Sequence, residues 1–528
     1  MHGLMMDLPL LISGLIQHAD RHHGATEIVS KTVEGTIHRY TYREAHRRSR
    51  QLANALQKLN VKPHDRVATL AWNGFRHYEI YYAVAGSGAV IHTINPRLFP
   101  EQIAYIANHA EDKVVFYDTT FAPLIEKLKP QLKSVKHFIP LDASYESLLE
   151  NDDFEWPSFD EKTAACLCYT SGTTGNPKGA LYSHRSTMIH AYAAALPDTL
   201  NLSAREVVLP VVPMFHVNAW SLPYSCTMVG AKMVFPGPHL DGKSLYELFE
   251  AEGVTMSAGV PTVWLGLLAH LRQNNLRFST LKSTVIGGSA CPPAMIREFQ
   301  DVYGVQVLHA WGMTEMSPLG TAGTLKAKQA KLPKDERYAI QNKQGRAIFG
   351  VDMRIVDENG SELPWDGKAF GNLEVRGPWV IKGYFKGEGG NPLHDGWFPT
   401  GDVCTIDPDG YIQITDRSKD VIKSGGEWIS SIDLENIAVA HPAIAEAAVI
   451  GVKHPKWDER PIVVVVKKPG ASLSKEYVLK FYQGKIAKWW MPDDVVFVNE
   501  LPHTATGKLS KLTLRQQMKD YKLDSRQD

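Results

Sequence analysis

The stretch Tyr169-Thr-Ser-Gly-Thr-Thr-Gly-Asn-Pro-Lys-Gly179 joins two apolar segments, Ala164–Tyr169 and Ala180–Tyr182. Both segments have strand-like composition, so we expect two strands joined by this loop. Glycine permits positive φ values, which lets backbone N–H groups converge on an anion. The serine and threonine hydroxyls add donors that can also ligate a hard cation. The stretch therefore predicts a phosphate clamp between strands; a plain hydrophilic turn is the alternative, which this density of donors disfavours.

The same stretch departs from the P-loop pattern G-x-x-x-x-G-K-[ST]. Counted from Gly172, the required second glycine falls on Pro177 and the required Ser/Thr falls on Gly179, so that only Lys178 fits. A P-loop also opens a helix, whereas a strand is expected after Gly179. A phosphotransferase or ATPase of the P-loop kind is therefore disfavoured.

Composition excludes several classes of function. The 528 residues carry 57 Lys+Arg and 57 Asp+Glu, a formal net charge of zero, so no general attraction for nucleic acid is expected. No uninterrupted apolar run approaches the roughly 18 residues of a membrane span, so integral membrane association is not expected. The five cysteines predict buried thiols in a reducing compartment rather than a metal site. These observations lead us to expect an enzyme of the cytoplasm.

The N-terminus lacks a secretory n-region, because the first Lys or Arg is Arg21. Instead, one face of a short amphipathic helix is expected there, formed by Leu8, Ile12, Leu15, Ile16 and Ala19. This face can dock on its own chain or on a neighbour, so a homodimer is one expected assembly.

Strand and helix patterns alternate over residues 38–140 and again from Val207 to Val307. The first helix is expected over Thr41–Leu59, with Thr41 as N-cap and Glu44 three residues later. Strands separated by helices predict βαβ units and mainly parallel sheets. Turn signals become denser after about residue 345, which predicts an antiparallel or barrel-like subdomain.

The predicted fold class is therefore α/β and α+β. A large N-terminal domain of helix-flanked sheets (1–416) includes the barrel-like subdomain (345–416). A small mobile α+β domain (417–528) follows, with helices expected over Ser431–Val439 and Lys475–Lys488. The joint near Asp416–Asp420 is short and charged, as expected of a hinge between compact units.

Five motifs resemble, in order, the signatures of the adenylate-forming superfamily of acyl-CoA synthetases, peptide-synthetase adenylation domains and luciferases. They are Ser171-Gly-Thr-Thr-Gly-Asn-Pro-Lys-Gly179, Trp311-Gly-Met-Thr-Glu315, Gly396-Trp-Phe-Pro-Thr-Gly-Asp402, Asp416-Arg-Ser-Lys-Asp-Val-Ile-Lys-Ser-Gly-Gly426 and Thr506-Gly-Lys508. Trp311 stands where the family has Tyr. One such motif is weak evidence, whereas five in the family's order identify the chain as a member.

The resemblance implies a site for Mg²⁺ and ATP. Thr174 and Glu315 offer the hard oxygen ligands that Mg²⁺ prefers, so they are the predicted metal ligands and catalytic residues alongside Lys508. Trp311 offers a ring face for adenine, and Asp402 can accept from both ribose hydroxyls. The predicted nucleotide-binding residues are Ser171, Gly172, Thr173, Thr174, Gly175, Lys178, Gly288, Ser289, His309, Ala310, Trp311, Gly312, Thr314, Asp402, Asp416, Arg417, Lys423 and Lys508.

The resemblance also implies a moving C-terminal domain. Lys508 is the family's catalytic lysine, which bridges the α-phosphate and the substrate carboxylate; without the motif it would read as an ordinary solvated lysine. Lys419, two residues after Arg417, occupies the family's hinge position, where the backbone absorbs a change in φ and ψ.

The resemblance also implies sites for the acyl group and CoA. They are expected in two further segments, Pro213-Met-Phe-His-Val-Asn-Ala-Trp220 and Lys423-Ser-Gly-Gly-Glu-Trp428. The predicted acyl- and CoA-binding residues are His216, Val217, Trp220, Gly425, Gly426 and Trp428. Glycines leave room for the thin pantetheine arm of CoA. From residue chemistry alone, burial of Trp220 and Trp428 in the hydrophobic core is as strongly expected as a role in binding.

The resemblance implies an ATP-dependent acyl-CoA synthetase, an AMP-forming acid–thiol ligase. It would convert a carboxylic acid, ATP and CoA to acyl-CoA, AMP and pyrophosphate through an acyl-adenylate. The acyl and CoA strings look most like fatty-acyl-CoA synthetases and 3-methylmercaptopropionate–CoA ligases, so a fatty or short- to medium-chain acid is expected. Alternatives are 3-methylmercaptopropionate as the specific acid, a luciferase-like oxygenase, and a non-catalytic binding protein, which would not be expected to keep Lys508 and Glu315.

Overall fold

The computed structural model describes residues 1, 3–170, 176–425, 427–503 and 509–523. The chain forms two units, each with its own sheets and core. The first unit is built from segments within Met1–Thr170, Pro177–Asp352 and Arg376–Phe398. The second unit is built from segments within Met353–Val375 and Pro399–Asp528. The expected division of the chain between residues 416 and 417 stays a prediction.

One sheet of the first unit has six described strands in the order β6-β5-β3-β4-β7-β8. Their bounds are β3 Arg66–Leu70, β4 Val90–Thr93, β5 Val114–Tyr117, β6 His137–Pro140, β7 Ala164–Tyr169 and β8 Gly179–Ser183. Adjacent strands run parallel except β8, which is antiparallel to β7. The βαβ pattern expected over residues 38–140 is therefore confirmed.

The other sheet of this unit has nine strands among the described residues, in the order β15-β14-β13-β12-β11-β9-β10-β1-β2. Their bounds are β1 Glu27–Lys31, β2 Ile37–Thr41, β9 Val207–Pro210, β10 Lys232–Phe235, β11 Met256–Gly259, β12 Ser283–Ile286, β13 Gln306–Gly312, β14 Leu319–Ala322 and β15 Arg346–Ala347. Neighbouring strands are parallel in the spatial order β1, β10, β9, β11, β12 and β13. At the edges, β2 is antiparallel to β1, β14 to β13, and β15 to β14.

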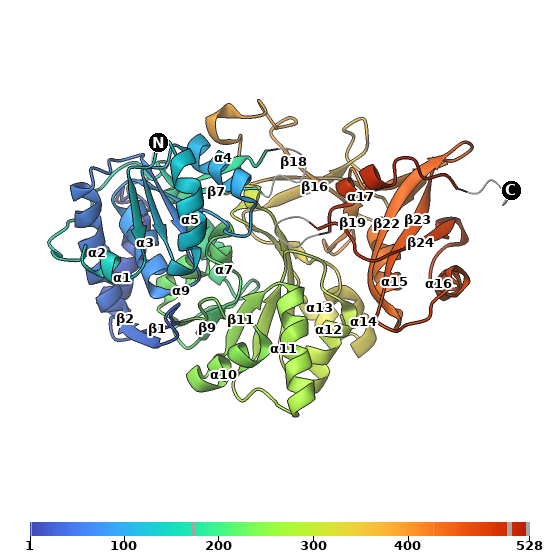
Figure 1. Ribbon diagram of the computed structural model, residues 1–528, viewed down its shortest axis with the longest axis horizontal. Helices are drawn as coiled ribbons and strands as arrows, with labels where there is room; N and C mark the ends of the chain where they lie inside the picture. The colour runs from blue at the N-terminus through green and yellow to red at the C-terminus, as the bar shows by residue number, and fades with distance from the viewer. Residues whose placement is uncertain (2, 171–175, 426, 504–508, 524–528) are drawn as a thin grey trace. The chain divides into compact units, whose positions relative to one another are not determined.

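Helices cover these sheets (Figure 1). Their bounds are α1 Ile12–His23, α2 Tyr42–Lys58, α3 Phe75–Gly86, α4 Pro100–Ala110, α5 Ala122–Leu128, α6 Ala143–Glu146, α7 His184–Ala195, α8 Val217–Trp220, α9 Leu222–Val229, α10 Gly242–Glu252, α11 Pro261–Asn274, α12 Pro293–Arg297, α13 Ala327–Ala330 and α14 Lys334–Gln341. Within the described residues, no helix combines the length and apolar character needed to cross a membrane.

Two helix starts show how local sequence sets the boundaries. At α2 the Thr41 hydroxyl accepts from the Glu44 N–H while the Glu44 carboxylate accepts from the Thr41 N–H, which confirms the predicted capping box. At α1 the helix begins at Ile12 rather than Leu8. Pro9 explains the difference, because a proline disfavours helical backbone in the residue before it.

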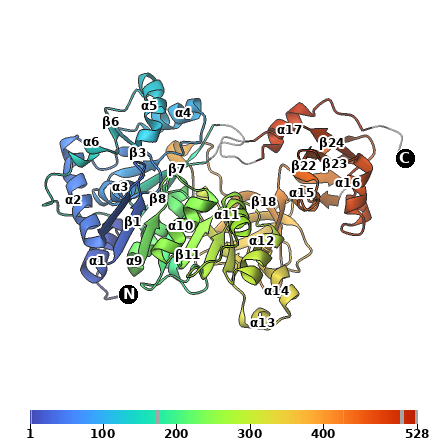
Figure 2. The same ribbon diagram turned by 60° about the horizontal axis from the view of Figure 1, so that its bottom comes forward.

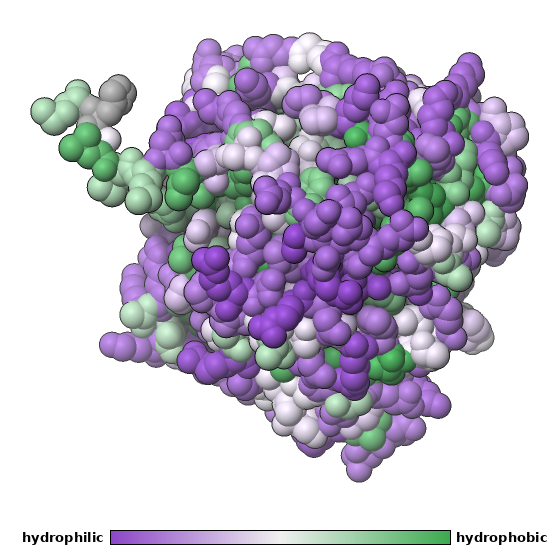
Figure 3. Space-filling view, turned by 90° about the vertical axis from the view of Figure 1, so that its left-hand side faces the viewer, coloured by the Kyte–Doolittle hydropathy of each residue, from purple (hydrophilic) through white to green (hydrophobic). Residues whose placement is uncertain are grey.

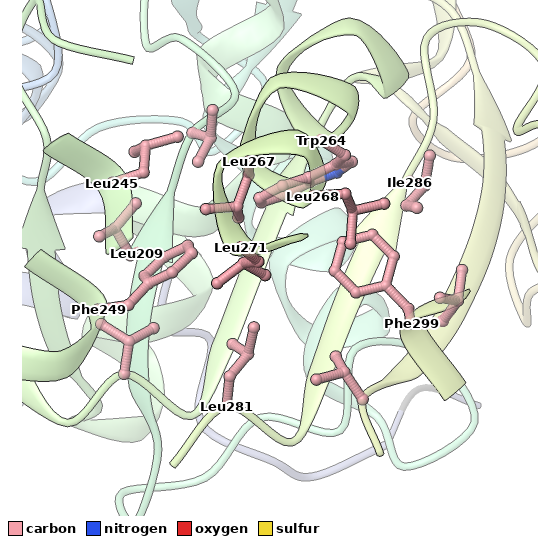
Figure 4. Close-up of a cluster of buried hydrophobic side chains, with 14 of the residues drawn as sticks. Leu209, Leu245, Phe249, Trp264, Leu267, Leu268, Leu271, Leu281, Ile286 and Phe299 are labelled. Carbon is pink, nitrogen blue, oxygen red and sulfur yellow. The ribbon is translucent and has the colours of Figure 1, made fainter. Parts of the chain in front are cut away.

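Helices α10 and α11 lie over the nine-stranded sheet (Figure 2), and a large apolar core lies between them and the sheet (Figure 4). Leu209 and Ile286 come from the sheet, Phe249 comes from α10, and Trp264 and Leu271 come from α11 (Figure 4). Each of these five side chains is at most 1% exposed, and burying one such side chain stabilises the fold by about 1.5–3 kcal/mol. This core fixes the strands whose carboxyl ends carry the predicted nucleotide-binding residues.

The second unit contains two sheets among the described residues. The strands of the first are β16 Asp352–Val356, β17 Gly371–Arg376, β18 Phe398–Ile406 and β19 Ile412–Arg417, in sequence order. This four-stranded sheet corresponds to the barrel-like subdomain expected after residue 345. The strands of the second are β20 Ile422–Ser424, β21 Glu427–Ile429, β22 Ile444–His454, β23 Asp458–Lys467 and β24 Asp494–Val498.

Helices α15 Ser431–Val439, α16 Lys475–Tyr482 and α17 Lys511–Gln517 complete this unit. The bounds predicted for α15 are confirmed, whereas α16 ends at Tyr482 rather than Lys488. Gly484, at φ 75°, explains the earlier end, because glycine adopts the left-handed backbone that terminates helices. Strands and helices follow one another in this α+β unit as predicted.

Candidate active site

The two strands expected on either side of the candidate phosphate loop are present. Strands β7 and β8 pair antiparallel with Tyr169 opposite Gly179. The Thr170 N–H donates to the Lys178 carbonyl at 2.9 Å, and the Lys178 N–H donates to the Thr170 hydroxyl at 3.1 Å. Ser171, Gly172, Thr173, Thr174 and Gly175 lie outside the described residues. The closed base of the loop confirms the hairpin and excludes the strand-to-helix geometry of a P-loop.

Glu315 lies in a short 3-10 turn, Thr314–Met316, between β13 and β14. Its side chain is 7% exposed, and the Tyr384 hydroxyl donates to its Oε1 at 2.8 Å. The Tyr182 hydroxyl holds the same turn by donating to the Thr314 carbonyl at 2.5 Å. Gly312 is required before the turn, because a Cβ there would lie 2.1 Å from the Pro318 carbonyl oxygen. The sequence thus provides the Glu315 carboxylate and, through Gly312, the tight turn that orients it.

Tyr384 was missed by the sequence motifs, yet it joins two of the predicted site residues. Its hydroxyl bonds Glu315, and the Lys178 ammonium lies 4.9 Å from the centre of its ring. Burial and the Glu315 carboxylate both raise the pKa of Tyr384, so the hydroxyl stays a donor at neutral pH. A cation over an aromatic face is an attractive arrangement. Tyr384 therefore positions both a candidate Mg²⁺ ligand and a candidate phosphate contact.

We expect Tyr384→Phe to lower kcat/KM for ATP about tenfold and to raise the Mg²⁺ concentration required for half-maximal rate. The reason is that the substitution removes one hydrogen bond to a carboxylate, an interaction of about 1.5–3 kcal/mol, while keeping the ring under Lys178. Initial rates at varied Mg²⁺ check this. Tyr338→Phe is the matched control, since it removes a 2.5 Å bond to the Asp301 carboxylate. An equal effect of both variants would contradict the role of Tyr384.

Two of the predicted nucleotide-binding segments lie side by side at the carboxyl ends of β12 and β13. Gly288 and Ser289 are exposed just after β12, and Gly288 needs its glycine because its φ is 79°. Next to them, β13 carries His309, Ala310, Trp311 and Gly312. The structure therefore places both segments on neighbouring parallel strands, as expected of a site at the carboxyl ends of a sheet.

His309 is a neutral structural donor rather than a charged ligand. It is 2% exposed, and burial lowers its pKa to about 4. Its Nε2 accepts from the Cys291 N–H at 3.3 Å, so its protonated Nδ1 donates to the Asn342 carbonyl at 3.2 Å. These bonds fix the loop after β12 against the segment after α14.

The acyl segment contains a left-handed turn. Val217, Asn218, Ala219, Trp220 and Ser221 have φ between 46° and 70°. Left-handed backbone costs roughly 1–2 kcal/mol for each non-glycine residue, so the surrounding packing has to impose it. Asn218 is the anchor: its Oδ1 accepts from the Tyr81 hydroxyl at 3.3 Å and from the Cys168 thiol at 3.6 Å.

The turn aims the Trp220 ring at the glycines after β12. A Cβ on Gly287 would lie 3.3 Å from the Trp220 ring, and one on Gly288 would lie 3.9 Å from it. The acyl segment and the candidate nucleotide segment are therefore in contact. Val217 is 3% exposed, while His216 and Trp220 are half-buried. Trp220 thus contacts the candidate nucleotide segment, and its role in the site stays a prediction.

In the second unit, strands β18 and β19 bring Asp402 and Arg417 together. The two residues are register partners, and Arg417 Nε lies 3.0 Å from Asp402 Oδ1. The Asp402 side chain is 5% exposed and that of Arg417 is 55% exposed. The pair thus combines a fixed carboxylate with an accessible guanidinium, as expected for holding ribose and phosphate oxygens. Asp416, next along β19, instead faces α15, where its Oδ2 accepts from the Ser431 N–H at 2.7 Å.

The candidate CoA segment is a tight hairpin between β20 and β21. Lys423 and Trp428 are register partners, and the Lys423 ammonium lies 5.6 Å from the centre of the Trp428 ring. Gly425 has φ 59°, and a Cβ there would lie 3.0 Å from Trp457 and 3.1 Å from Trp489. Gly426 lies outside the described residues. The sequence motifs missed both Trp457 and Trp489, because neither residue lies within a motif.

The hinge candidate Lys419 is exposed in a turn between β19 and β20, and Lys508 lies outside the described residues. All five cysteines are free and buried, as predicted. The described residues hold no group of three or more His, Cys, Asp or Glu side chains that could ligate a metal. Mg²⁺ in nucleotide sites usually takes one or two protein oxygens besides phosphates and water, and the buried, oriented Glu315 carboxylate fits that use.

Two family models match the chain over most of its length. One, described as AMP-binding enzyme, matches residues 15–385. The other, described as AMP-binding enzyme C-terminal domain, matches residues 433–508. The chain belongs to the AMP-binding enzyme family. The expected membership in the adenylate-forming superfamily is thus confirmed, and the two matches leave residues 386–432, which include the expected joint, between them.

Individual members of the family match along the whole chain. A 3-methylmercaptopropionyl-CoA ligase of Ruegeria lacuscaerulensis is 56% identical over 98% of this chain and 99% of its own length. A medium-chain-fatty-acid–CoA ligase of Ectopseudomonas oleovorans is 53% identical over 99% of each. The ATP-bound structure of MatB from Rhodopseudomonas palustris is similar at a TM-score of 0.82 and 26% identity, covering 97% of this chain and 100% of that one. The α/β and α+β fold class is thereby confirmed.

Proposed function

We propose that the chain is an ATP-dependent acyl-CoA synthetase, an AMP-forming acid–thiol ligase. The observation that carries the proposal is whole-length similarity to two CoA ligases at 56% and 53% identity. The buried Glu315 turn and the Asp402–Arg417 pair support it, because both are the oxygen- and anion-binding groups that the reaction needs. Mg²⁺, ATP and CoA are the proposed metal and co-substrates.

In the first step, a carboxylate oxygen attacks the α-phosphorus of ATP and pyrophosphate leaves, giving an acyl-adenylate. This is a reaction between anions, so positive groups have to stabilise the negative charge that accumulates on the α-phosphoryl oxygens. Lys508 is the proposed cation. Asp402 accepts from the ribose hydroxyls and Trp311 packs on adenine. Glu315 and Thr174 would hold Mg²⁺, which neutralises phosphate charge when bound.

In the second step, the CoA thiol attacks the acyl carbonyl and AMP leaves. The mixed anhydride has AMP as a good leaving group, so this step needs alignment of the thiol more than further activation. Gly425, Gly426 and Trp428 are the proposed CoA contacts. Trp457 and Trp489 extend this set, because their rings pack directly around Gly425. We propose that Lys419 is the pivot that exchanges Lys508 for this hairpin between steps.

The proposed acid is a fatty or short- to medium-chain acid, with 3-methylmercaptopropionate as the specific alternative. The 56% identity to a 3-methylmercaptopropionyl-CoA ligase favours 3-methylmercaptopropionate. The 53% identity to a medium-chain-fatty-acid–CoA ligase favours a medium-chain fatty acid. Trp220 lies against Gly287 and Gly288, and we propose that its ring borders the acyl chain.

A panel of acids from acetate through 3-methylmercaptopropionate and octanoate to palmitate, each with ATP and CoA, tests this proposal. We expect AMP release to be fastest for a short- or medium-chain acid, because the chain is 56% and 53% identical to ligases named for such acids. AMP release that is fastest with palmitate would contradict the proposed preference for a short- or medium-chain acid. Oxygen uptake or light without CoA would favour the luciferase-like alternative.

A cytoplasmic homodimer completes the proposal. The apolar face of α1 is buried on its own chain, with Ile12 and Ile16 fully covered. The segment before α1 is exposed and apolar, with Leu4, Met5 and Met6 each at least 86% exposed. An apolar arm projects from the largely hydrophilic face in Figure 3. An exposed apolar arm supports docking on a second copy, and the free thiols support a reducing compartment.

A further inference from the structure

The joint between the two sheets of the second unit is four residues long. Strand β19 ends at Arg417 in the four-stranded sheet, and β20 begins at Ile422 in the next sheet. The Arg417 carbonyl accepts from the Asp420 N–H at 2.8 Å and from the Val421 N–H at 3.0 Å, so the joint is a compact turn. Any rotation of one sheet against the other has to occur within this turn.

Two hydrogen bonds span the joint. Asp416, which precedes it, accepts from the Ser431 N–H at 2.7 Å. Ser430, which follows it, donates through its hydroxyl to the Thr415 carbonyl. Asp416 is 1% exposed and Thr415 is 5% exposed, so both bonds are dry. Because the partners lie on opposite sides of the joint, these bonds exist in only one orientation of the two sheets.

Lys511, the first residue of α17, completes this contact. Its ammonium donates to the Ser431 hydroxyl and lies 2.8 Å from Glu435 Oε1. The Lys511 and Glu435 side chains are only 10% and 15% exposed. Burial raises the pKa of Asp416 and the Lys511 ammonium opposes that rise, so the two charges are close enough to interact. Glu435 and Lys511 both follow the joint, so their pair fixes the ammonium in place. Lys511 supports the contact across the joint through Ser431 and its attraction for Asp416.

We infer that Asp416, Ser431, Glu435 and Lys511 form a latch that holds the adenylation orientation, and that Lys511 is its positioning residue. Asp416 is opposite Val403, next to the Asp402–Arg417 pair that we assign to ribose. Lys508 precedes Lys511 by three residues, which limits the separation of their Cα atoms to about 11 Å. The latch therefore fixes Lys511, the first residue of α17, close to the strand that carries the Asp402–Arg417 pair. This inference rests on the proposed function.

Charged groups suit a latch that has to open once in each cycle. When it opens, water can hydrate Asp416 and Lys511, and this hydration offsets much of the lost contact energy. Opening an apolar contact of the same area would instead cost free energy, because apolar surface would become exposed to water. Arg515, one turn further along α17, pairs with Asp420 in the joint itself, which ties the same helix to the hinge.

Lys511→Met tests the latch, because it removes the ammonium and keeps the apolar stem. We expect acid-dependent exchange between pyrophosphate and ATP to fall about tenfold or more, since the adenylation orientation becomes less populated. Thioester formation from added acyl-adenylate and CoA should stay within about twofold of the wild-type rate. Lys511→Arg should restore part of the exchange. Lys475→Met, which removes an ion pair to Asp494 on the same unit, is the matched control.

Limited trypsin digestion gives a readout independent of activity. We expect faster cleavage after Lys419 in Lys511→Met than in wild type, detected as a fragment that begins at Asp420, with Lys475→Met unchanged. Equal loss of both partial reactions, or unchanged exchange with unchanged cleavage, would overturn the latch. A wild-type chain that lacks both partial reactions would instead overturn the proposed function, and the cleavage comparison would still decide the latch.

Discussion

Replacing Lys508 with alanine should lower acid-dependent exchange between pyrophosphate and ATP by about a hundredfold to a thousandfold, the range for loss of one oriented charge-stabilising group. The attack of a carboxylate on a polyphosphate accumulates negative charge, and Lys508 is the cation assigned to it. Thioester formation from supplied acyl-adenylate should persist, because AMP already leaves readily and no new phosphoryl bond forms. Separate assays of the two partial reactions check this asymmetry.

Lys519→Ala is the matched control for that variant, since it removes an exposed lysine from the same C-terminal region. It should leave both partial reactions unchanged. If Lys508→Ala slowed both partial reactions equally, the lysine would have another role, such as binding CoA or maintaining the fold.

Replacing Lys419 with proline should slow thioester formation about tenfold or more while sparing adenylation, the opposite pattern to Lys511→Met. Proline fixes φ near −65°, so the hinge residue can no longer absorb the rotation that presents the Gly425 hairpin. The latch contacts then keep the adenylation orientation. Single-turnover measurements of acyl-adenylate formation and decay separate the two steps.

Lys419→Ala is the control for the hinge, because it removes the same charge and leaves φ free. It should resemble wild type in both steps. Full rates of both steps in Lys419→Pro would show that no swing about this residue is needed. A loss in Lys419→Ala equal to that in Lys419→Pro would place the effect in the side chain instead of the backbone.

Local signals were sufficient for much of the fold. The capping box at Thr41 and Glu44 set the start of α2, and the helix expected over Ser431–Val439 has the bounds of α15. The loop between β7 and β8 was recognisable because its glycines and hydroxyls are contiguous in sequence. The nucleotide residues that lie within motifs, such as Glu315 and Asp402, could be proposed for the same reason.

Long-range contacts explain what the sequence could not show. The left-handed turn at Val217–Ser221 has no glycine, and it depends on Tyr81 and Cys168, which lie far away in the chain. Tyr384 is 69 residues from Glu315, yet it orients that carboxylate. Asp416 is the first residue of a family motif and was therefore assigned to the nucleotide site. Its side chain instead faces α15, and only the folded chain brings Lys511 close to it.

The most direct test of the central claim is exchange of radiolabel from pyrophosphate into ATP, measured with and without a carboxylic acid and followed by product analysis in the presence of CoA. The proposed chemistry predicts exchange that requires the acid, with AMP and pyrophosphate as the nucleotide products. ADP and phosphate among the products, or exchange that ignores the acid, would contradict it.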